Sequence, residues 1–428
     1  MKLSKKKVRY LILEGGGGKG LIYLGAGKAL ADLGILSYTK KLIGEKEVYR
    51  LSPRKIKGIA GTSVGSLAAA LIASGYTPEE LHKKLTKNFG LHILDKVDYG
   101  AIPTAYTKEK PRYIIPEREM PEEQESLDTF WKHYKESEKK DPSKLLKLPA
   151  KALNRLNRRT VGNLMKWYLD NQGRKEKKKE PKKAEKSMLQ MATTKNAFEK
   201  VLHSPDSMNS LKYELGFFVS EFIRKFVDLH IERKSGIKNC TFKQFYKEFK
   251  IDLVITGFNM TRNEVLIFRN GKQWGDLCVA DAVRMSVSIP LLFKPFYLNY
   301  EKGKILPVDD DLKNGDLIVD GGVGINFPLH VFDEVKSRSS KLNNQVLGFR
   351  LKRTVHKSDD DVTVADYLSD LFFSLLGATT ELQIRTDEEK DQVIELDHHE
   401  INALDFLYGE TTKKYIDMAY ETTMKYFE

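Results

Sequence analysis

The sequence predicts an α/β protein: a mainly parallel sheet covered by helices on both faces, with a basic helical insertion. Two features predict the sheet. Short apolar runs rich in β-forming residues alternate with apolar helical segments, and glycines follow the runs. A third feature predicts the insertion: residues 131–200 hold 21 Lys and Arg against 8 Asp and Glu, a net charge of +13 that equals the excess of the whole chain.

The N-terminal part begins with two predicted strand–helix units. These are strand 8–13 with helix 20–33, and strand 56–60 with helix 64–74. Gly34 is a fitting stop for the first helix. A third helix follows, because Thr77, Pro78 and Glu80 have the spacing of a capping box with proline at the first helical position. Parallel strands need helical crossovers of this kind, so the alternation indicates a parallel sheet with both faces covered.

The character of the chain changes near residue 100, where lysines cluster and strand signals disappear. We therefore predict that residues 1–99 and 246–428 form two halves of one α/β domain, and that residues 100–245 form a basic, mostly helical and partly flexible insertion. Its lysine-rich run 174–183 is expected to be disordered. Strand candidates that rejoin the sheet are residues 251–258, 265–269, 317–320 and 346–351, and residues 364–376 have helical spacing.

Composition is that of a globular protein of 428 residues, with 41% hydrophobic and 31% charged residues. The two cysteines, Cys240 and Cys278, are too few for a disulfide framework and have no metal-ligand spacing, so we expect a reducing compartment and no metal. The apolar run 8–13 is too short for a signal peptide, and no stretch approaches the ~18 apolar residues of a membrane span. The expected location is cytoplasmic, peripheral to a membrane, or outside the cell by export without a cleaved signal.

A possible nucleophile lies between the second predicted strand and its helix. Gly61-Thr-Ser63-Val-Gly65 matches GxSxG, in which the glycines allow a tight strand-to-helix turn that exposes the serine. The pattern arises by chance often enough that a glycine-rich turn with an idle serine is the competing interpretation. Its position between a strand and a helix favours the nucleophile.

A second glycine-rich turn links the first strand and helix. It comprises Gly15, Gly16, Gly17, Gly18, Lys19 and Gly20. Consecutive amides at a helix start can hold negative charge. A Walker A loop is excluded because Gly20 follows Lys19, whereas a dinucleotide-binding GxGxxG stays open although no acid closes the next strand. An oxyanion hole is favoured, since the ends of adjacent parallel strands lie side by side and would bring these amides to Ser63.

The serine needs a base. Asp320 ends a predicted strand and is followed by Gly321 and Gly322, which let other groups approach its carboxylate. Asp-Gly-Gly is also a common turn. The alternative base is a histidine of the C-terminal half, as in an α/β-hydrolase triad, but none has a distinctive setting: His330, His356, His398 and His399.

These three motifs, in this order, resemble the patatin-like phospholipase family. Its signature is a glycine-rich oxyanion loop with a basic residue, a GxSxG serine and an Asp-Gly-Gly or Asp-Gly-Ala aspartate. Further similarity lies in residues 282–295, 326–328 and 401–406, so the resemblance covers about residues 8–95 and 250–428. The chain departs from the pattern at Glu14, at the fourth glycine Gly18, and in the long basic insertion.

The resemblance implies a lipid acyl hydrolase of the phospholipase A or lysophospholipase type with a Ser-Asp dyad. Asp320 would take the proton of Ser63, Ser63 would attack an ester carbonyl, and the Gly15–Gly20 amides would hold the oxyanion. No cofactor or metal is implied. Besides the phospholipid substrate, the partners it allows are an anionic membrane surface and a protein activator. An esterase with a histidine triad and a catalytically dead lipid- or nucleotide-binding module are the alternatives.

The charge of residues 131–200 admits several partners. Phosphates of nucleic acid, anionic lipid headgroups and acidic proteins would each suit it, and so would plain solvation. No nucleic-acid motif accompanies the lysines, so we expect no nucleic-acid binding. Trp131, Tyr134, Trp167 and Tyr168 interleave with the basic residues and favour an anionic membrane surface.

Overall fold

The computed structural model describes most of the two predicted halves of the α/β domain. The described residues are 2–85, 105–106, 111–112, 215–218, 220–301, 304–305, 315–336, 339–352, 374, 377–399, 401 and 409–428. The basic segment 131–200, the lysine run 174–183 and nearly all of the helix predicted at 364–376 lie outside them. The proposed boundaries at residues 99 and 245 therefore stay predictions.

A mainly parallel sheet of eight strands forms the centre of the molecule, which confirms the predicted fold class. Its order is β11-β14-β8-β4-β1-β17-β18, with β9 on β8. Strands β8, β4, β1, β17 and β18 run parallel, whereas β9, β14 and β11 are antiparallel to their neighbours. The strands are β1 Tyr10–Leu13, β4 Gly58–Gly61, β8 Asp252–Asn259, β9 Glu264–Phe268, β11 Phe296–Leu298, β14 Asp316–Asp320, β17 Val346–Leu351 and β18 Val393–Leu396.

Alternate side chains of the central strands enter two separate cores. Leu11 and Leu13 of β1 lie in the larger core, while Ile12 between them lies in the smaller one. Helices pack over the larger core. The smaller core lies under the segment that follows Asp320, which contributes Phe327 and Leu329. Because both faces are covered, β1 and β4 carry no charged residue and do not alternate between polar and apolar side chains.

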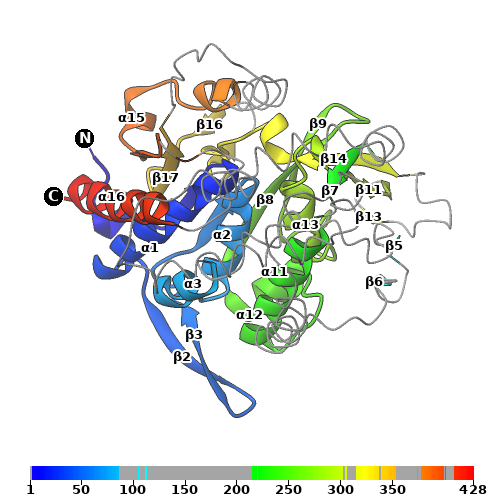
Figure 1. Ribbon diagram of the computed structural model, residues 1–428, viewed down its shortest axis with the longest axis horizontal. Coiled ribbons are helices and arrows are strands. Elements are labelled where there is room, and N and C mark those ends of the chain that lie inside the picture. Colours follow the sequence, from blue (N-terminus) through cyan, green and yellow to red (C-terminus); the bar gives the residue numbers. More distant parts are fainter. Residues whose placement is uncertain are drawn as a thin grey trace, which may run out of the picture.

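Helices follow the strands as expected from the sequence. Helix α2 leaves β4 directly and packs on β4, β1 and β8, with α11 and α13 beside it, and α1 lies along α16 (Figure 1). The predicted capping box is present, with the Thr77 amide donating to Glu80 and the Glu80 amide donating to Thr77. The helices are α1 Tyr23–Asp32, α2 Val64–Ala73, α3 Pro78–Leu85, α11 Glu221–Ser235, α12 Phe242–Phe249, α13 Val279–Ser286, α15 Asp387–Lys390 and α16 Glu410–Tyr426.

Several small elements complete the described part. A two-stranded hairpin, β2 with β3, projects from the body (Figure 1) and was not predicted, because its strands carry lysines and glutamates in place of an apolar face. Three short 3-10 helices are η1 Lys5–Lys7, η2 Gly17–Ile22 and η4 Gly321–Val323. The remaining strands are β2 Tyr38–Ile43, β3 Lys46–Leu51, β5 Ala105–Tyr106, β6 Pro111–Arg112, β7 Gly216–Phe218, β10 Leu291–Phe293, β12 Tyr300–Glu301, β13 Lys304–Ile305, β15 Glu334–Lys336 and β16 Ser339–Lys341.

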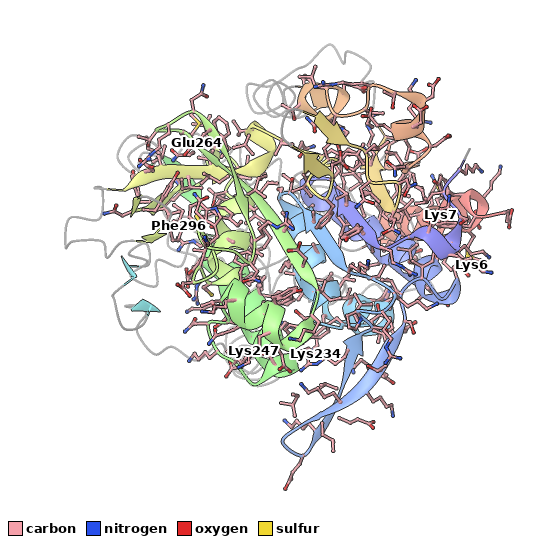
Figure 2. The ribbon with its side chains drawn as sticks, turned by 180° about the vertical axis from the view of Figure 1, so that it is seen from behind. Lys6, Lys7, Lys234, Lys247, Glu264 and Phe296 are labelled. Carbon is pink, nitrogen blue, oxygen red and sulfur yellow. The ribbon has the colours of Figure 1, made fainter. Side chains whose placement is uncertain are left out.

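Strand β8 brings β4 and β14 together end to end. Its residues 257–259 pair with both β14 and β9, and Ile255 pairs with both β4 and β9. A strand has two edges, so β4 and β14 share the edge opposite β9. They run toward each other and stop at Gly61 and Asp320, with Thr256 of β8 between their ends. From behind, β8 is seen beside the blue strands of the N-terminal part (Figure 2).

Two further expectations concern ions and membranes. No group of His, Cys, Asp and Glu among the described residues has the arrangement of a metal site. Cys240 and Cys278 are both buried and belong to no disulfide among the described residues. Of the helices in the described ranges, none combines the length and the apolar character that crossing a bilayer requires.

Candidate active site

Ser63 occupies a strained turn between β4 and α2. Its φ is 52° and its ψ is −128°, a backbone conformation that residues other than glycine rarely adopt. The glycines on either side are required, since a Cβ at Gly61 would lie 2.2 Å from the Gly65 carbonyl oxygen and a Cβ at Gly65 would lie 2.3 Å from that of Leu13. The structure therefore gives the GxSxG sequence the geometry of a nucleophile elbow.

Asp320 lies at the other side of the junction between β4 and β14. It is fully buried, and its Oδ1 accepts the amide of Gly322 at 2.8 Å. Gly321 is required here because a Cβ would lie 2.2 Å from Oγ1 of Thr256. Burial raises the pKa of Asp320 to about 7, while the Ser63 hydroxyl and the Gly322 amide act to lower it.

The second carboxylate oxygen of Asp320 lacks a partner of this kind in the described part of the chain. Oδ2 is buried and accepts no hydrogen bond of standard geometry from the described residues, although the Ser63 hydroxyl lies near enough to affect the pKa of the carboxyl. A buried acceptor without a donor costs free energy, which is the condition in which a carboxylate binds a proton readily.

One short segment holds the backbones of both residues. The amide of Ser63 donates to Oγ of Ser286 at 2.8 Å, and the amide of Asp320 donates to the carbonyl oxygen of Ser288 at 2.9 Å. Both serines are buried at the end of α13 and just after it. The sequence contains them within the run 282–290, but nothing in that run indicates these two contacts.

The glycine loop lies against the turn at Ser63. A Cβ at Gly15 would lie 3.0 Å from Cβ of Ser63, and one at Gly20 would lie 2.6 Å from the Val64 side chain. The amide of Gly15 is already bonded to the carbonyl oxygen of Asn326 at 3.1 Å. Gly17 and Gly18 begin the 3-10 helix η2, so the geometry of that helix provides no acceptor for their amides. Gly16, just before these two glycines, packs against Leu351: a Cβ added at Gly16 would lie 2.0 Å from Cδ1 of Leu351.

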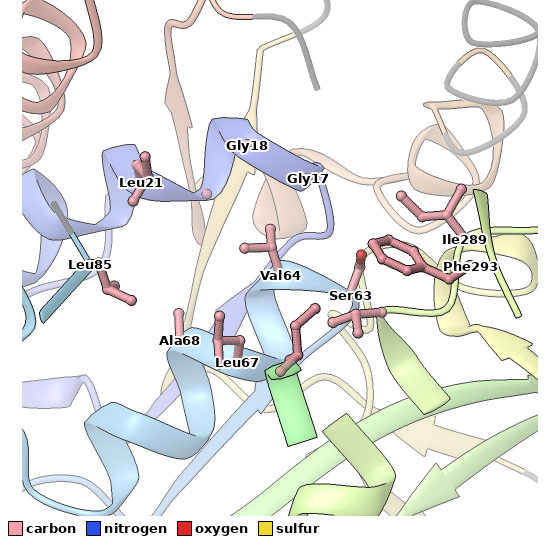
Figure 3. A pocket seen from close by; sticks show the side chains of 13 residues that line it. Gly17, Gly18, Leu21, Ser63, Val64, Leu67, Ala68, Leu85, Ile289 and Phe293 are labelled. Atoms are coloured by element: carbon pink, nitrogen blue, oxygen red, sulfur yellow. The ribbon is translucent and has the colours of Figure 1, made fainter. Parts of the chain in front are cut away.

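An apolar pocket opens at Ser63. Most of its lining is aliphatic or aromatic, and it includes the backbone of the glycine loop. In Figure 3, Ser63 lies at the start of α2 between Val64 and Phe293, with Gly17 and Gly18 on the adjoining ribbon. The lining residues are Gly17, Gly18, Gly20, Leu21, Ser63, Val64, Leu67, Ala68, Leu85, Ile223, Val287, Ile289 and Phe293.

Two of the C-terminal histidines contact carboxylates other than Asp320. Nδ1 of His330 contacts Asp333 at 2.8 Å, and Nε2 of His399 contacts Asp397 at 3.3 Å. His398 is buried, and burial lowers its pKa to about 4, with the nearby Lys19 charge lowering it further. His356 lies outside the described residues.

A buried polar cluster behind the glycine loop is the feature that the sequence did not predict. Glu14 accepts hydrogen bonds from the Leu351 amide at 2.5 Å, from Oγ1 of Thr380 at 2.5 Å, and from Nδ2 of Asn326 at 3.2 Å. Burial raises the pKa of Glu14 to about 7, while the Thr380 hydroxyl, the Leu351 amide and the charges of Arg350 and Lys19 act to lower it. In the sequence, Glu14 was visible only as a departure from the family pattern.

A strained serine between two glycines, at the carboxyl end of a parallel strand, has the geometry that the sequence predicts for a nucleophile. The family model described as patatin-like phospholipase matches residues 11–333. The chain belongs to this family, which confirms the resemblance seen in the three motifs.

Two viral proteins are similar to parts of this chain. The chain is 24% identical over 205 residues to the probable lipid hydrolase 463L of Invertebrate iridescent virus 6, which covers 45% of this chain and 64% of that protein. It is 29% identical over 128 residues to the uncharacterized protein R571 of Acanthamoeba polyphaga mimivirus, covering 30% of this chain and 36% of that one. The match thus spans somewhat under two thirds of 463L and about a third of R571.

Solved structures give more distant similarity. VipD from Legionella pneumophila is 15% identical with a TM-score of 0.42, covering 98% of this chain and 67% of VipD. The ExoU–SpcU complex from the type III secretion system of Pseudomonas aeruginosa gives 15% identity and a TM-score of 0.37, covering 99% of this chain and 52% of the matched chain.

Proposed function

We propose that this protein hydrolyses fatty-acyl esters of phospholipids through an acyl-enzyme on Ser63, with Asp320 as the base. The observation that carries the proposal is the meeting of β4 and β14 on one edge of β8, which directs Ser63 and a buried carboxylate into the same small space. Membership of the patatin-like phospholipase family and the relative named a probable lipid hydrolase support the lipid substrate.

Asp320 suits the role of base without a histidine. A serine hydroxyl is a poor acid, so a carboxylate with an ordinary pKa of 3.8 would seldom take its proton. Burial that raises the pKa of Asp320 to about 7 makes it a stronger base that is still ionised in neutral solution about half of the time. A histidine triad has no support in the contacts of His330 and His399.

In the proposed reaction Ser63 attacks the ester carbonyl while its proton passes to Asp320. The negative charge that forms on the carbonyl oxygen is accepted by the amides of Gly17 and Gly18, which adjoin Ser63 in the pocket. The proton then passes from Asp320 to the leaving alcohol, and water repeats the sequence to free the fatty acid. Lys19 adds positive potential to the loop. Gly15 does not bind the oxyanion but anchors the loop, because its amide is bonded to the carbonyl oxygen of Asn326.

The apolar lining of the pocket supports an acyl chain as the group held next to Ser63. Leu67, Ile223 and Phe293 offer contact area but no charge to a substrate. An ester with a long hydrocarbon chain gains affinity from every buried methylene, about 0.8 kcal/mol each. A charged or sugar-like substrate would gain nothing from these walls.

The basic segment 131–200 is proposed to hold the enzyme against anionic lipid. Each lysine near a negatively charged surface contributes about 1 kcal/mol, so several together suffice for peripheral binding. Replacing Lys175, Lys177, Lys178 and Lys179 with Gln should weaken sedimentation with phosphatidylserine vesicles and leave binding to neutral vesicles as it was. Unchanged sedimentation with the anionic vesicles would remove this part of the proposal. The need for a protein activator stays a prediction.

The reaction itself is tested by product analysis. Wild-type protein mixed with vesicles of a natural phospholipid extract should release free fatty acids and lysophospholipids, identified by mass spectrometry. Ser63→Ala should release neither, with a loss of at least about 10⁴-fold. Equal product from the two proteins would refute the assignment of Ser63.

A further inference from the structure

Glu14 stands at the point where the first strand leaves the sheet. Its amide still follows the parallel ladder and donates to the carbonyl oxygen of Phe349 at 3.2 Å. In a ladder that continued, the next bond would run from the Leu351 amide to the backbone carbonyl of Glu14. That bond is absent. The Leu351 amide donates to the Glu14 carboxylate instead, and the Glu14 carbonyl accepts the Tyr23 hydroxyl at 2.7 Å.

The side chain of Glu14 therefore replaces its own backbone carbonyl in the sheet. This exchange lets the peptide after Glu14 turn out of the strand, which is where the glycine loop starts. Because the acceptor must reach back to Leu351 from a backbone that has turned away, the length of a glutamate is required. A serine or an alanine at this position would leave the Leu351 amide unpaired in the core, which destabilises the fold.

The other carboxylate oxygen ties the loop to a second segment. Oε1 accepts from Oγ1 of Thr380 and from Nδ2 of Asn326, and that same amide nitrogen lies 3.2 Å from the Gly15 carbonyl oxygen. The Gly15 amide donates to the Asn326 carbonyl oxygen. Gly15 is thus held on both sides by Asn326, which Glu14 holds in turn. All of these groups are buried, Glu14 at 4% exposure, Asn326 at 3% and Thr380 at 1%.

We propose that Glu14 is a positioning residue for the glycine loop: the ionised carboxylate holds Gly15 and Asn326 so that the amides of Gly17 and Gly18 point at the oxyanion of Ser63. The proposal rests on the function proposed above, because it concerns the same reaction. Glu14 does not touch the reacting atoms. Gly15 separates it from Ser63, and the hydrogen bonds of its carboxylate described above run to Leu351, Thr380 and Asn326.

The ionised form is the one that fits. The Leu351 amide and the Asn326 amide nitrogen can only donate, so a protonated Glu14 could give its proton only to Thr380. Charged groups that face Glu14 are Arg350 on β17 and Lys19 on η2, both of which favour ionisation, and Tyr23 on α1 bonds its backbone. Since burial raises the pKa of Glu14 to about 7, the loop should lose its anchor in the same pH range in which Asp320 takes up a proton.

Two protonations that each lower activity give a distinctive pH profile while both carboxyl groups titrate. For wild-type protein, log kcat/KM should fall with a slope approaching 2 below about pH 6, one unit for each carboxyl group. Glu14→Gln should lower kcat about 100-fold with little change in KM, as expected when donors move by about 1 Å, and should reduce the slope to 1. Glu14→Asp, which keeps the charge but is one methylene shorter, should not rescue kcat.

The matched control is Glu389→Gln. Glu389 is also buried and accepts backbone amides, those of Arg385 and Thr386, but it lies in a capping box of α15 and far along the chain from the loop. It should lose stability and keep both kcat and the slope of 2. Thr380→Val removes one donor that lowers the pKa of Glu14. The acid limb of the kcat/KM profile of this variant should therefore lie at higher pH than that of wild type.

The outcomes separate the two proposals. If Glu14→Gln keeps wild-type kcat and a slope of 2 while Ser63→Ala is inactive, the positioning role is refuted and the hydrolase stands. If Ser63→Ala remains active, the hydrolase proposal itself fails. Should Glu14→Gln fail to fold, the pH shift of Thr380→Val decides: an acid limb at the wild-type position contradicts the positioning role.

Discussion

Asp320 and Glu14 are two buried carboxylates, one at the end of β14 and one before the glycine loop, and each has its pKa raised to about 7 by burial. Their partners differ. Glu14 accepts three hydrogen bonds through both oxygens, whereas Asp320 has one oxygen bonded to the Gly322 amide and one that accepts no standard hydrogen bond from described residues. A carboxylate whose acceptors are all used holds structure in place. A carboxylate with an unused acceptor beside a hydroxyl can take up a proton. The pKa alone therefore does not distinguish a positioning residue from a base.

The largest expected difference between the two carboxylates is in turnover. Asp320→Asn keeps the size of the side chain but cannot take the proton of Ser63, and kcat should fall about 10⁴-fold, well beyond the 100-fold expected for Glu14→Gln. Fatty-acid release from phospholipid vesicles at pH 8 measures both. Equal losses in the two variants would erase the distinction between a base and a positioning residue.

A smaller effect is expected at the segment that holds Ser63. Ser286→Ala leaves the buried amide of Ser63 without an acceptor. The strained backbone of Ser63, with its φ of 52°, is then held less firmly. We expect kcat to fall about 10-fold and the free energy of unfolding by about 1–3 kcal/mol. Ser288→Ala is the control, because the contact of Ser288 with Asp320 is made by its backbone. A normal kcat in Ser286→Ala would show that the elbow needs no such support.

Stability should distinguish the carboxylates as well. With a folded pKa near 7 and an ordinary value of 3.8, Asp320 holds a proton in the folded state over that range and not in the unfolded state. Stability is therefore lost as pH rises from about 4 to 7. Asp320→Asn removes this loss and should be more stable than wild type at pH 8, by about 2–4 kcal/mol, with the gain vanishing near pH 4.

Glu14→Gln should gain less stability at pH 8. The NH₂ group of the new glutamine would face one of the three groups that donate to Glu14, and two donors facing each other cost about 1–3 kcal/mol of stability. Chemical denaturation of both variants at pH 8 and pH 4 measures the difference. An Asp320→Asn protein that is less stable than wild type at pH 8 would contradict the buried, poorly paired carboxylate described here.

Local sequence signals were sufficient for the parts of the site that depend on neighbouring residues. The turn at Ser63 is determined by Gly61 and Gly65, and the turn after Asp320 by Gly321, so these could be predicted. The contacts of Glu14 could not, since its partners Asn326 and Thr380 lie 312 and 366 residues away. The meeting of β4 and β14 was equally hidden, because strand direction is set by pairing with β8 and not by the residues of β14.

The central claim is that Asp320, and no histidine, activates Ser63. The most direct measurement is the rate at which a fluorophosphonate labels the protein, with mass spectrometry to locate the label. Wild type and the single variants His330→Ala, His356→Ala, His398→Ala and His399→Ala should all be labelled on Ser63 at similar rates, while Asp320→Asn should be labelled at least about 10³-fold more slowly. Loss of labelling in any histidine variant, or normal labelling of Asp320→Asn, would contradict the dyad.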